Sequence, residues 1–351
     1  MNIVKRGGLY HKVRWYERRM PRVVFIGITA FCIATAAYAL TQSYYGRIYV
    51  VSNQTIPEKA YLRVAAVGDI ACSPDDPNFN NGQGLGNACQ SAAVSRAIQK
   101  ERLDGVLLLG DIQYNSGKLA DFERSFVPYW RSITAPMYPV PGNHDYGNGS
   151  GGTIEDYSTV FRTYFPAALD DNDDTPGYYV RGLSETWNII GLNSNCEYVG
   201  GCGIDSKQLN WLNDKLRKDS HVCTIAFWHH PVFTSGVHNT APDTSYGRDF
   251  WDSLTAARAD IVLNGHDHNF ERFAKQLPDG TLSSAGMREF VVGTGGVGLR
   301  PVGAAVSSAQ EKVFDDQFGY LLLKLYKGWY AWEFKGIDGV VHDSGTDSCI
   351  R

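Results

Sequence analysis

Several features of common protein classes are missing from this sequence. No two cysteines have the CxxC spacing of a structural zinc site. Charged residues make up only 20% of the chain against 43% hydrophobic ones, which excludes an intrinsically disordered protein. Positive charge is concentrated at the amino terminus: residues 1–22 carry +6 and the whole chain −4, so the rest carries −10. A body this acidic is poorly suited to bind nucleic acid phosphates, and we expect no nucleic acid partner.

Long, predominantly apolar runs are also scarce, and residues 23–40 form the one that is long enough for a membrane helix. The basic residues before it predict a cytoplasmic amino terminus, with everything after Leu40 outside the cytoplasm. Ala37, Tyr38 and Ala39 resemble a signal-peptidase site, so secretion after cleavage near Ala39 is the alternative to an anchor. The length of chain before the run favours the uncleaved anchor.

The predicted organisation is one exported catalytic domain. Residues 1–22 form a basic cytoplasmic segment, 23–41 the membrane anchor or signal segment and 42–60 a linker. The domain covers 61–345, and 346–351 form a carboxyl-terminal tail. We find no internal repeat, and the polar residues described below draw on most of the domain. This favours one domain over the two that 351 residues allow.

Six cysteines follow the apolar run, and an even number in an oxidising compartment suggests disulfide bonds. Cys223 falls in a predicted buried strand, so a plain buried thiol is the alternative for this residue. Proximity along the chain favours the first two of the following pairs and leaves the third by elimination: Cys72–Cys89, Cys196–Cys202 and Cys223–Cys349.

Apolar spacing predicts alternating strands and helices up to about residue 268, and strands with glycine-rich turns after it. Expected helices include 88–101, 118–131 and 247–257. Asp205 and Gln208 have the spacing of a capping box before a further helix. Strands are expected at 269–277, 288–294, 318–326 and 329–335. Asn193, Ser194 and Asn195 end another strand and are interpreted as structural.

Five predicted strands end in side chains that can bind metals. Residues 106–109 have the pattern of a strand buried on both faces, and Asp111 follows its end, with Tyr114 three residues on. In open α/β sheets, ligands bind at the carboxyl ends of strands. The other four strand ends supply Asp69, Asn143 with His144, His229, and His266 with His268.

Each of these residues taken singly has an ordinary structural explanation. Asp69 or Asp145 could cap a turn, Asn143 could occupy left-handed backbone, and His266 or His268 could lie at the surface. Five coincidences in order are a poorer explanation than a common site. The set of carboxylates, amide, imidazoles and phenol, without thiolate, suits Fe, Mn or Zn. It is large enough for two cations about 3.5–4 Å apart.

The blocks GD, GDxxY, GNHD, HxP and GHxH, in this order, resemble the calcineurin-like metallophosphoesterases, and the tyrosine of GDxxY resembles their purple acid phosphatase branch. The resemblance covers roughly residues 61–345. It implies an α/β fold, a four-layer α/β/β/α sandwich with metals at the sheet rims, here preceded by one N-terminal hydrophobic helix. The family usually has Asp-x-Gly in its first block, whereas this chain has Ala71.

The resemblance implies two metal sites that share the carboxylate of Asp111. The first, for Fe³⁺, consists of Asp69, Asp111, Tyr114 and His268. The second, for Zn²⁺, Fe²⁺ or Mn²⁺, consists of Asp111, Asn143, His229 and His266.

Three further residues have expected catalytic roles. His144 matches the family histidine that contacts the phosphate, and Asp145 is expected to orient it. His238, nine residues after His229, matches a histidine on the substrate side in small purple acid phosphatases, with a surface position as the alternative. His230 is expected to support the site or to pack.

These expectations describe an extracytoplasmic phosphatase, at the cell surface or in the periplasm, that cleaves small phosphomonoesters by attack of a metal-held hydroxide on phosphorus. Alternatives are a phosphodiesterase or nucleotidase with the same metal site, or a non-catalytic metal-binding module displayed on the membrane. The membrane would be contacted through the N-terminal helix if it is uncleaved, and no protein partner is inferred. Substrate specificity is expected in the loops 74–87, 146–153 and 196–203.

Overall fold

The computed structural model describes residues 61–147, 151–166, 177–304 and 307–351. The chain divides into two units, Met1–Ala60 and Tyr61–Arg351. The predicted cytoplasmic segment, hydrophobic helix and linker all lie outside the described residues. Within the described residues, no helix has the length and apolar character needed to span a membrane.

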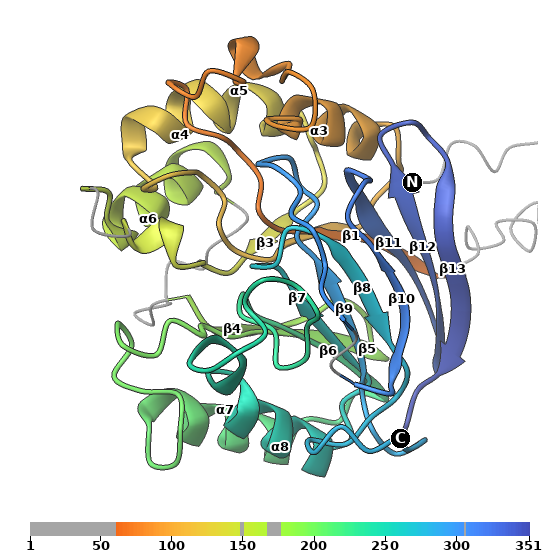
Figure 1. Ribbon diagram of the computed structural model, residues 1–351. Coiled ribbons are helices and arrows are strands. Elements are labelled where there is room, and N and C mark those ends of the chain that lie inside the picture. Colours follow the sequence, from red (N-terminus) through yellow and green to blue (C-terminus); the bar gives the residue numbers. More distant parts are fainter. Residues whose placement is uncertain (1–60, 148–150, 167–176, 305–306) are drawn as a thin grey trace, which may run out of the picture. The chain divides into compact units, whose positions relative to one another are not determined.

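The second unit contains two sheets that lie next to each other as layers (Figure 1). The first has the order β13-β12-β11-β1-β2-β3, in which β1, β2 and β3 are parallel and the others antiparallel. Its strands are β1 (Leu62–Val67), β2 (Gly105–Leu108), β3 (Met137–Pro139), β11 (Gly319–Tyr326), β12 (Trp329–Gly336) and β13 (Val341–Ser348).

The second sheet has the order β10-β8-β9-β7-β6-β5-β4, with β5, β6, β7 and β9 parallel. Its strands are β4 (Tyr179–Gly182), β5 (Trp187–Gly191), β6 (Cys223–Phe227), β7 (Ile261–Asn264), β8 (Phe270–Phe273), β9 (Arg288–Val292) and β10 (Gln310–Phe314).

Helices cover the outer face of each sheet (Figure 1). Those on the first sheet are α3 (Ser91–Gln99), α4 (Leu119–Ser125), α5 (Val127–Trp130) and α6 (Ile154–Tyr164). Those on the second are α7 (Lys207–Lys218) and α8 (Arg248–Ala256). Single 3₁₀ turns are η1 (Asn80–Gly82), η2 (His144–Tyr146) and η3 (Asp243–Ser245). The mixed α/β class with two packed sheets is therefore confirmed.

The strand predicted at 106–109 explains how the layers are held together. Val106 and Leu108 belong to the core shared with α3, α4, α5 and α6, whereas Leu107 and Leu109 belong to the core between the two sheets. Because successive side chains of a strand point to opposite faces, a strand buried on both faces needs a continuous apolar run. The prediction of a central buried strand is confirmed.

Most expected helices and strands begin or end within four residues of their observed bounds, and two differences change the organisation of the chain. The helix expected at 118–131 is divided into α4 and α5, because Pro128 lies in the first turn of α5 and has no N–H to continue the α4 hydrogen bonds. The domain does not end at 345, since β13 continues to Ser348 and pairs with β12. The mostly polar sequence of β13 carries little strand signal.

All three predicted disulfide bonds are present. Their Cα–Cα distances are 5.3 Å for Cys72–Cys89, 5.1 Å for Cys196–Cys202 and 5.6 Å for Cys223–Cys349. The last bond attaches the end of the chain to the buried strand β6, so the thiol alternative for Cys223 is wrong.

Candidate metal centre

The carboxyl ends of strands from both sheets meet at one place, and the residues that follow them have unusual backbone conformations. Asp69, Asp111 and His266 each have a positive φ, of 60°, 49° and 70°. Such a conformation costs free energy in a residue other than glycine, and it is concentrated at functional sites. Each turns the chain directly after a strand, so the side chain stays at the sheet edge.

The glycine before each of these residues allows a close approach. A Cβ placed on Gly110 would lie 2.6 Å from Nδ1 of His229, and one on Gly265 would lie 2.6 Å from Oδ2 of Asp69. The ligand-type side chains therefore fill the space that a larger residue would need. Ala71, where the family has glycine, has no positive φ, and its Cβ is accommodated in the core.

The four residues predicted for the first metal site lie together. Oη of Tyr114 is 2.7 Å from Oδ1 of Asp69, 2.7 Å from Oδ2 of Asp111 and 3.1 Å from Nε2 of His268. Nε2 of His268 is in turn 3.4 Å from Oδ1 of Asp69. A single phenolic proton cannot satisfy two carboxylates, so this group of oxygens fits a cation.

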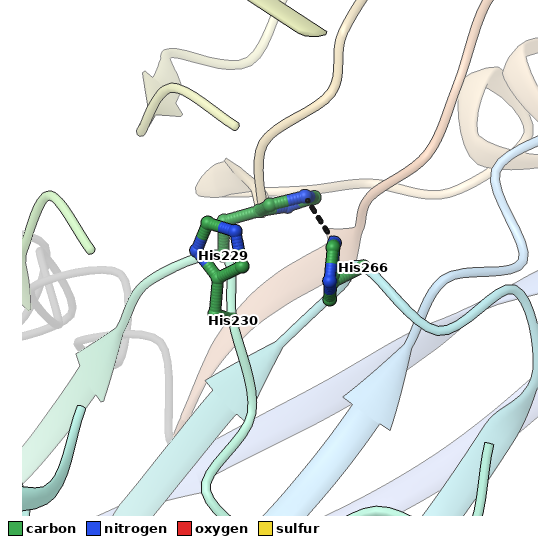
Figure 2. A group of neighbouring side chains, drawn as sticks. All are labelled: His229, His230 and His266. Atoms are coloured by element: carbon green, nitrogen blue, oxygen red, sulfur yellow. Dashed lines mark hydrogen bonds between the residues drawn. The ribbon is translucent and has the colours of Figure 1, made fainter. Parts of the chain in front are cut away.

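The residues predicted for the second site lie beside the first group. Oδ2 of Asp111 is 3.3 Å from Nε2 of His229, which is 3.2 Å from Nδ1 of His266 (Figure 2). Oδ1 of Asn143 is buried and has no hydrogen-bond partner among the described residues. A buried carbonyl oxygen without a partner is costly, and a metal would satisfy it.

Two of the imidazoles are held by backbone carbonyls. Nδ1 of His229 lies 2.9 Å from the Leu109 carbonyl oxygen, and Nδ1 of His268 lies 2.7 Å from that of Gly298. A hydrogen bond from Nδ1 directs Nε2 at the site, where it can bind a metal once it carries no proton. In His266 the nitrogen directed at the site is Nδ1, since it faces Nε2 of His229.

The charges in the group also fit a cation. Burial raises the pKa of Tyr114 well above its usual value, and the neighbouring Asp111 and Asp69 raise it further. Burial alone would lower the pKa of His229, but the carboxylates of Asp111 and Asp69 raise it to about 9. In the absence of metal, a proton on His229 thus offsets the negative charge. A metal ion would take over that role.

His144 lies at the edge of this group. Its backbone N–H donates to Oδ1 of Asp111 at 2.8 Å, its Nδ1 is 2.6 Å from the Asn115 carbonyl oxygen, and its Nε2 is 3.9 Å from Oδ2 of Asp111. The ring also packs on Tyr114, with centroids 4.2 Å apart. This position is compatible with contact to a phosphate held at the centre.

Asp145 does not orient the His144 ring, so that part of the prediction is wrong. Its buried carboxylate accepts hydrogen bonds from the backbone N–H groups of Ile112 at 3.1 Å and Gly142 at 2.9 Å. Burial and the nearby Asp111 raise the pKa of Asp145 to about 8. Asp145 instead joins the loops that carry Asp111 and Asn143.

The structure brings His238 to the site from the loop after β6. Its ring lies 4.1 Å from that of His266, measured between centroids. Its Nδ1 is 3.0 Å from Oδ1 of Asp267, and Thr234 donates to the other oxygen of the same carboxylate at 2.5 Å. Asp267 was not predicted to have a role, because it occupies the unspecified position of the GHxH block.

Two further residues lie at the site, although neither was predicted to be a ligand or a catalytic group. His230 lies beside His229 and His266 (Figure 2), and its Nδ1 is 2.7 Å from Oγ of Ser194. Oδ2 of Asp243 is 3.4 Å from Nε2 of His266. His230 was expected only to support the site or to pack, and Asp243 lies in η3, a segment without a periodic apolar pattern.

A cleft of about 310 Å³ adjoins the centre. Asn143, His238 and His266 line it on the side of the proposed ligands. The rest of its lining consists of Cys196, Glu197 and Tyr198 from the Cys196–Cys202 loop, Asp243 of η3, Tyr246 directly after η3, and Asn195 and His230.

The sequence matches one family model, that of the calcineurin-like phosphoesterases, over residues 62–270. Purple acid phosphatase 4 of Arabidopsis thaliana is 26% identical over 228 residues, which covers 58% of this chain and 64% of the relative. A probable cyclic nucleotide phosphodiesterase of Psychrobacter arcticus is 25% identical over 228 residues, covering 63% and 78%.

Solved structures share the fold. The purple acid phosphatase PPD1 of yellow lupin superposes with a TM-score of 0.64 at 19% identity, covering 83% of this chain and 54% of that one. GAP50, described as the anchor in the inner membrane complex of Plasmodium, superposes with a TM-score of 0.62 at 17% identity, covering 84% and 90%.

Proposed function

The chain belongs to the calcineurin-like phosphoesterase family, and from this premise we propose that it is a dinuclear-metal phosphatase acting on phosphomonoesters. The resemblance drawn from the five sequence blocks is confirmed at the level of the family, and purple acid phosphatases are among its relatives. The observation that carries the proposal is that the seven predicted ligand side chains lie where strands of the two sheets end, around two buried carboxylates and an amide oxygen without a hydrogen-bond partner among the described residues.

In this proposal, the first metal, Fe³⁺, would be held by Asp69, Asp111, Tyr114 and His268. The second, Zn²⁺, Fe²⁺ or Mn²⁺, would be held by Asp111, Asn143, His229 and His266. When bound, two such metals lower the pKa of water and neutralise phosphate oxygens.

The residues around the metals would handle the phosphate and the leaving group. His144 is fixed by its contacts with Asn115 and Tyr114, and its Nε2 remains available for a phosphate oxygen. Nδ1 of His238 faces the carboxylate of Asp267, and its Nε2 lies 3.4 Å from Nη1 of Arg300. A proton donated to the leaving oxygen would come from this Nε2. Asp145 keeps the Asp111 and Asn143 loops in register.

Hydrolysis of p-nitrophenyl phosphate and of bis-(p-nitrophenyl) phosphate by the metal-loaded protein tests the proposal. We expect kcat/KM for the monoester to exceed that for the diester by at least about tenfold, because a monoester carries the additional charge that two metals stabilise. Metal content, measured on the same sample, is needed to interpret a negative result. No turnover of either ester with both metals bound would contradict an enzymatic function.

Two alternatives are distinguished by the same experiment. A preference for the diester would support a phosphodiesterase or nucleotidase, a reading favoured by the name of the Psychrobacter relative. Binding of metal without turnover would support a non-catalytic module displayed on the membrane; the Plasmodium neighbour is described as an anchor in a membrane complex. The complete set of ligands in this chain argues against the second alternative, because loss of activity would be expected to leave the set incomplete.

Tyr114→Phe should abolish a visible absorption band of the iron-loaded protein. A phenol normally has a pKa of about 10 and ionises near neutral pH only beside a strong Lewis acid, which a trivalent iron provides. The purple acid phosphatase resemblance implies a charge-transfer band from such a phenolate. The variant should also retain less metal at the Asp69 and His268 site.

Visible spectroscopy and metal analysis of the wild type and the variant measure both effects. Tyr157→Phe provides a matched control, since its buried hydroxyl has no hydrogen-bond partner among the described residues and the residue lies in α6. An iron-loaded wild type without visible absorption, or a Tyr114→Phe protein that keeps it, would indicate two divalent metals instead.

We also propose that the domain is exported and held at the membrane by residues 23–40. Three disulfide bonds among the six cysteines after this segment fit an oxidising compartment. The proposed substrate is a small soluble phosphate ester, which needs no nucleic acid or protein partner.

A further inference from the structure

We infer that the cleft beside the metal centre selects phosphate esters whose alcohol carries an ammonium group, an inference that rests on the proposed phosphatase function. The leaving alcohol of an ester bound at the metals must extend away from His144 and the ligands. The cleft of about 310 Å³ lined by His238 and His266 is the space next to them. Its lining therefore meets the alcohol.

The charge of the lining favours a cation. Glu197 and Asp243 both line the cleft, and no lysine or arginine is among its described lining residues; Arg300 lies behind the lining, with Nη1 3.4 Å from Nε2 of His238. Asp243 is partly buried, with its carboxylate 3.4 Å from Nε2 of His266, whereas Glu197 is exposed at the rim. Both carboxylates act on Tyr246: burial raises the pKa of its phenol, and Glu197 and Asp243 raise it further. The two acids thus border the same space.

A buried ring nitrogen of His266 at the cleft also lacks a hydrogen-bond partner among the described residues. His266 is 7% exposed, and its Nε2 forms no hydrogen bond with any described residue. Because Nδ1 of the same ring faces His229, Nε2 lies on the side of Asp243 and the cleft. A bound molecule in the cleft can meet this nitrogen.

Aromatic side chains supply the second element of ammonium recognition. Tyr198 and Tyr246 line the cleft, and an ammonium group is attracted to the face of such a ring. Tyr198 is 57% exposed, so its ring is accessible to a ligand. Tyr246 packs edge-on against His230, with centroids 5.1 Å apart.

The wall that carries Glu197 and Tyr198 is held in place before any ligand arrives. The Cys196–Cys202 disulfide closes this short loop. Tyr198 stacks on Tyr146, with ring centroids 4.4 Å apart and an interplanar angle of 20°. Oη of Tyr146 in turn accepts a hydrogen bond from Asn193 at 2.7 Å. A wall that is ordered in advance reduces the cost of binding.

A pair of esters that differ in one charge tests the inference. O-phosphocholine and 3,3-dimethylbutyl phosphate have the same shape, but the second has carbon in place of the quaternary nitrogen. With the full-length, metal-loaded protein, we expect kcat/KM for phosphocholine to be about tenfold higher, the range of a cation–π contact reinforced by carboxylates. Glu197→Gln and Tyr198→Leu should each lower this ratio severalfold.

Glu185→Gln is the matched control. Glu185 is exposed in the turn between β4 and β5 and outside the cleft, so the change removes the same charge without altering the lining. It should leave the ratio as in the wild type. A wild-type ratio near or below one, or the same ratio in Glu197→Gln as in Glu185→Gln, would overturn the inference while p-nitrophenyl phosphate is still hydrolysed. No turnover of any ester would overturn the proposed function as well.

Discussion

Asp111→Asn should lower kcat by about 10³-fold or more and reduce the metal content at both sites. Oδ2 of Asp111 lies 2.7 Å from Oη of Tyr114 and 3.3 Å from Nε2 of His229, so this carboxylate is shared by the two groups of ligands. An amide is neutral and presents a single oxygen. Metals contribute several kcal/mol to the stabilisation of transition-state charge, and each 1.36 kcal/mol corresponds to tenfold in rate. Turnover of p-nitrophenyl phosphate and metal per protein measure the two effects.

Asp260→Asn is the control for replacing a buried carboxylate. Asp260 precedes β7, at the opposite end of the strand from His266, and accepts hydrogen bonds from the backbone of Thr224 and Ile350. We expect this variant to lose about 1–3 kcal/mol of stability, as for other disturbed buried hydrogen bonds, and to retain its metals and turnover. An Asp111→Asn protein that keeps both metals and falls less than about tenfold in kcat would exclude the shared role.

The sequence predicted those site residues that have a metal-binding side chain and also lie just after a strand. Asp69, Asp111, Asn143, His229 and the histidines of GHxH each lie within four residues of the end of a strand, and local apolar patterns predict strands. Parallel strands bring such positions to one edge. The order of the five blocks then sufficed to assemble one group of residues from positions nearly two hundred residues apart.

Contacts between residues far apart in sequence could not be predicted in the same way. Asp145 bonds to Ile112, 33 residues away, and Asp267 bonds to His238, 29 residues away. Neither contact has a local pattern, because both depend on where loops from different strands meet. For Asp145 the sequence suggested a role relative to the adjacent histidine, and for Asp267 it suggested none, whereas both carboxylates bind groups from other loops.

The predicted capping box at Asp205 fails for a related reason. Asp205 has a φ of 68°, and the helix begins one residue later, with Ser206 accepting a hydrogen bond from the Leu209 N–H at 3.1 Å. Gln208 is fully buried and binds both the backbone N–H and the carbonyl of Asn193. The side chain of Gln208 therefore makes a tertiary contact with Asn193 instead of the capping contact that the local spacing predicted.

His238→Ala should lower turnover of alkyl phosphates by about 10²–10⁴-fold, the usual effect of losing a general acid, without changing metal content. Nδ1 of His238 is tied to Asp267, and its ring packs against His266 at the rim of the cleft. A leaving alkoxide needs a proton, whereas p-nitrophenolate is stable without one. The loss should therefore be much smaller for p-nitrophenyl phosphate. Comparing kcat for esters whose alcohols span a range of pKa values measures this difference.

His221→Ala is the matched control, because His221 forms the same kind of pair with Asp219 away from the metal centre. Its Nδ1 is 2.6 Å from Oδ1 of Asp219, and its side chain is 26% exposed against 28% for His238. Removing this imidazole should leave turnover of both classes of ester unchanged. If His238→Ala slowed alkyl and p-nitrophenyl phosphates equally, the imidazole would bind the phosphate without donating a proton. In that case the acid would have to be sought among the other groups of the cleft, of which His230 is the nearest imidazole to His266 not assigned to a metal.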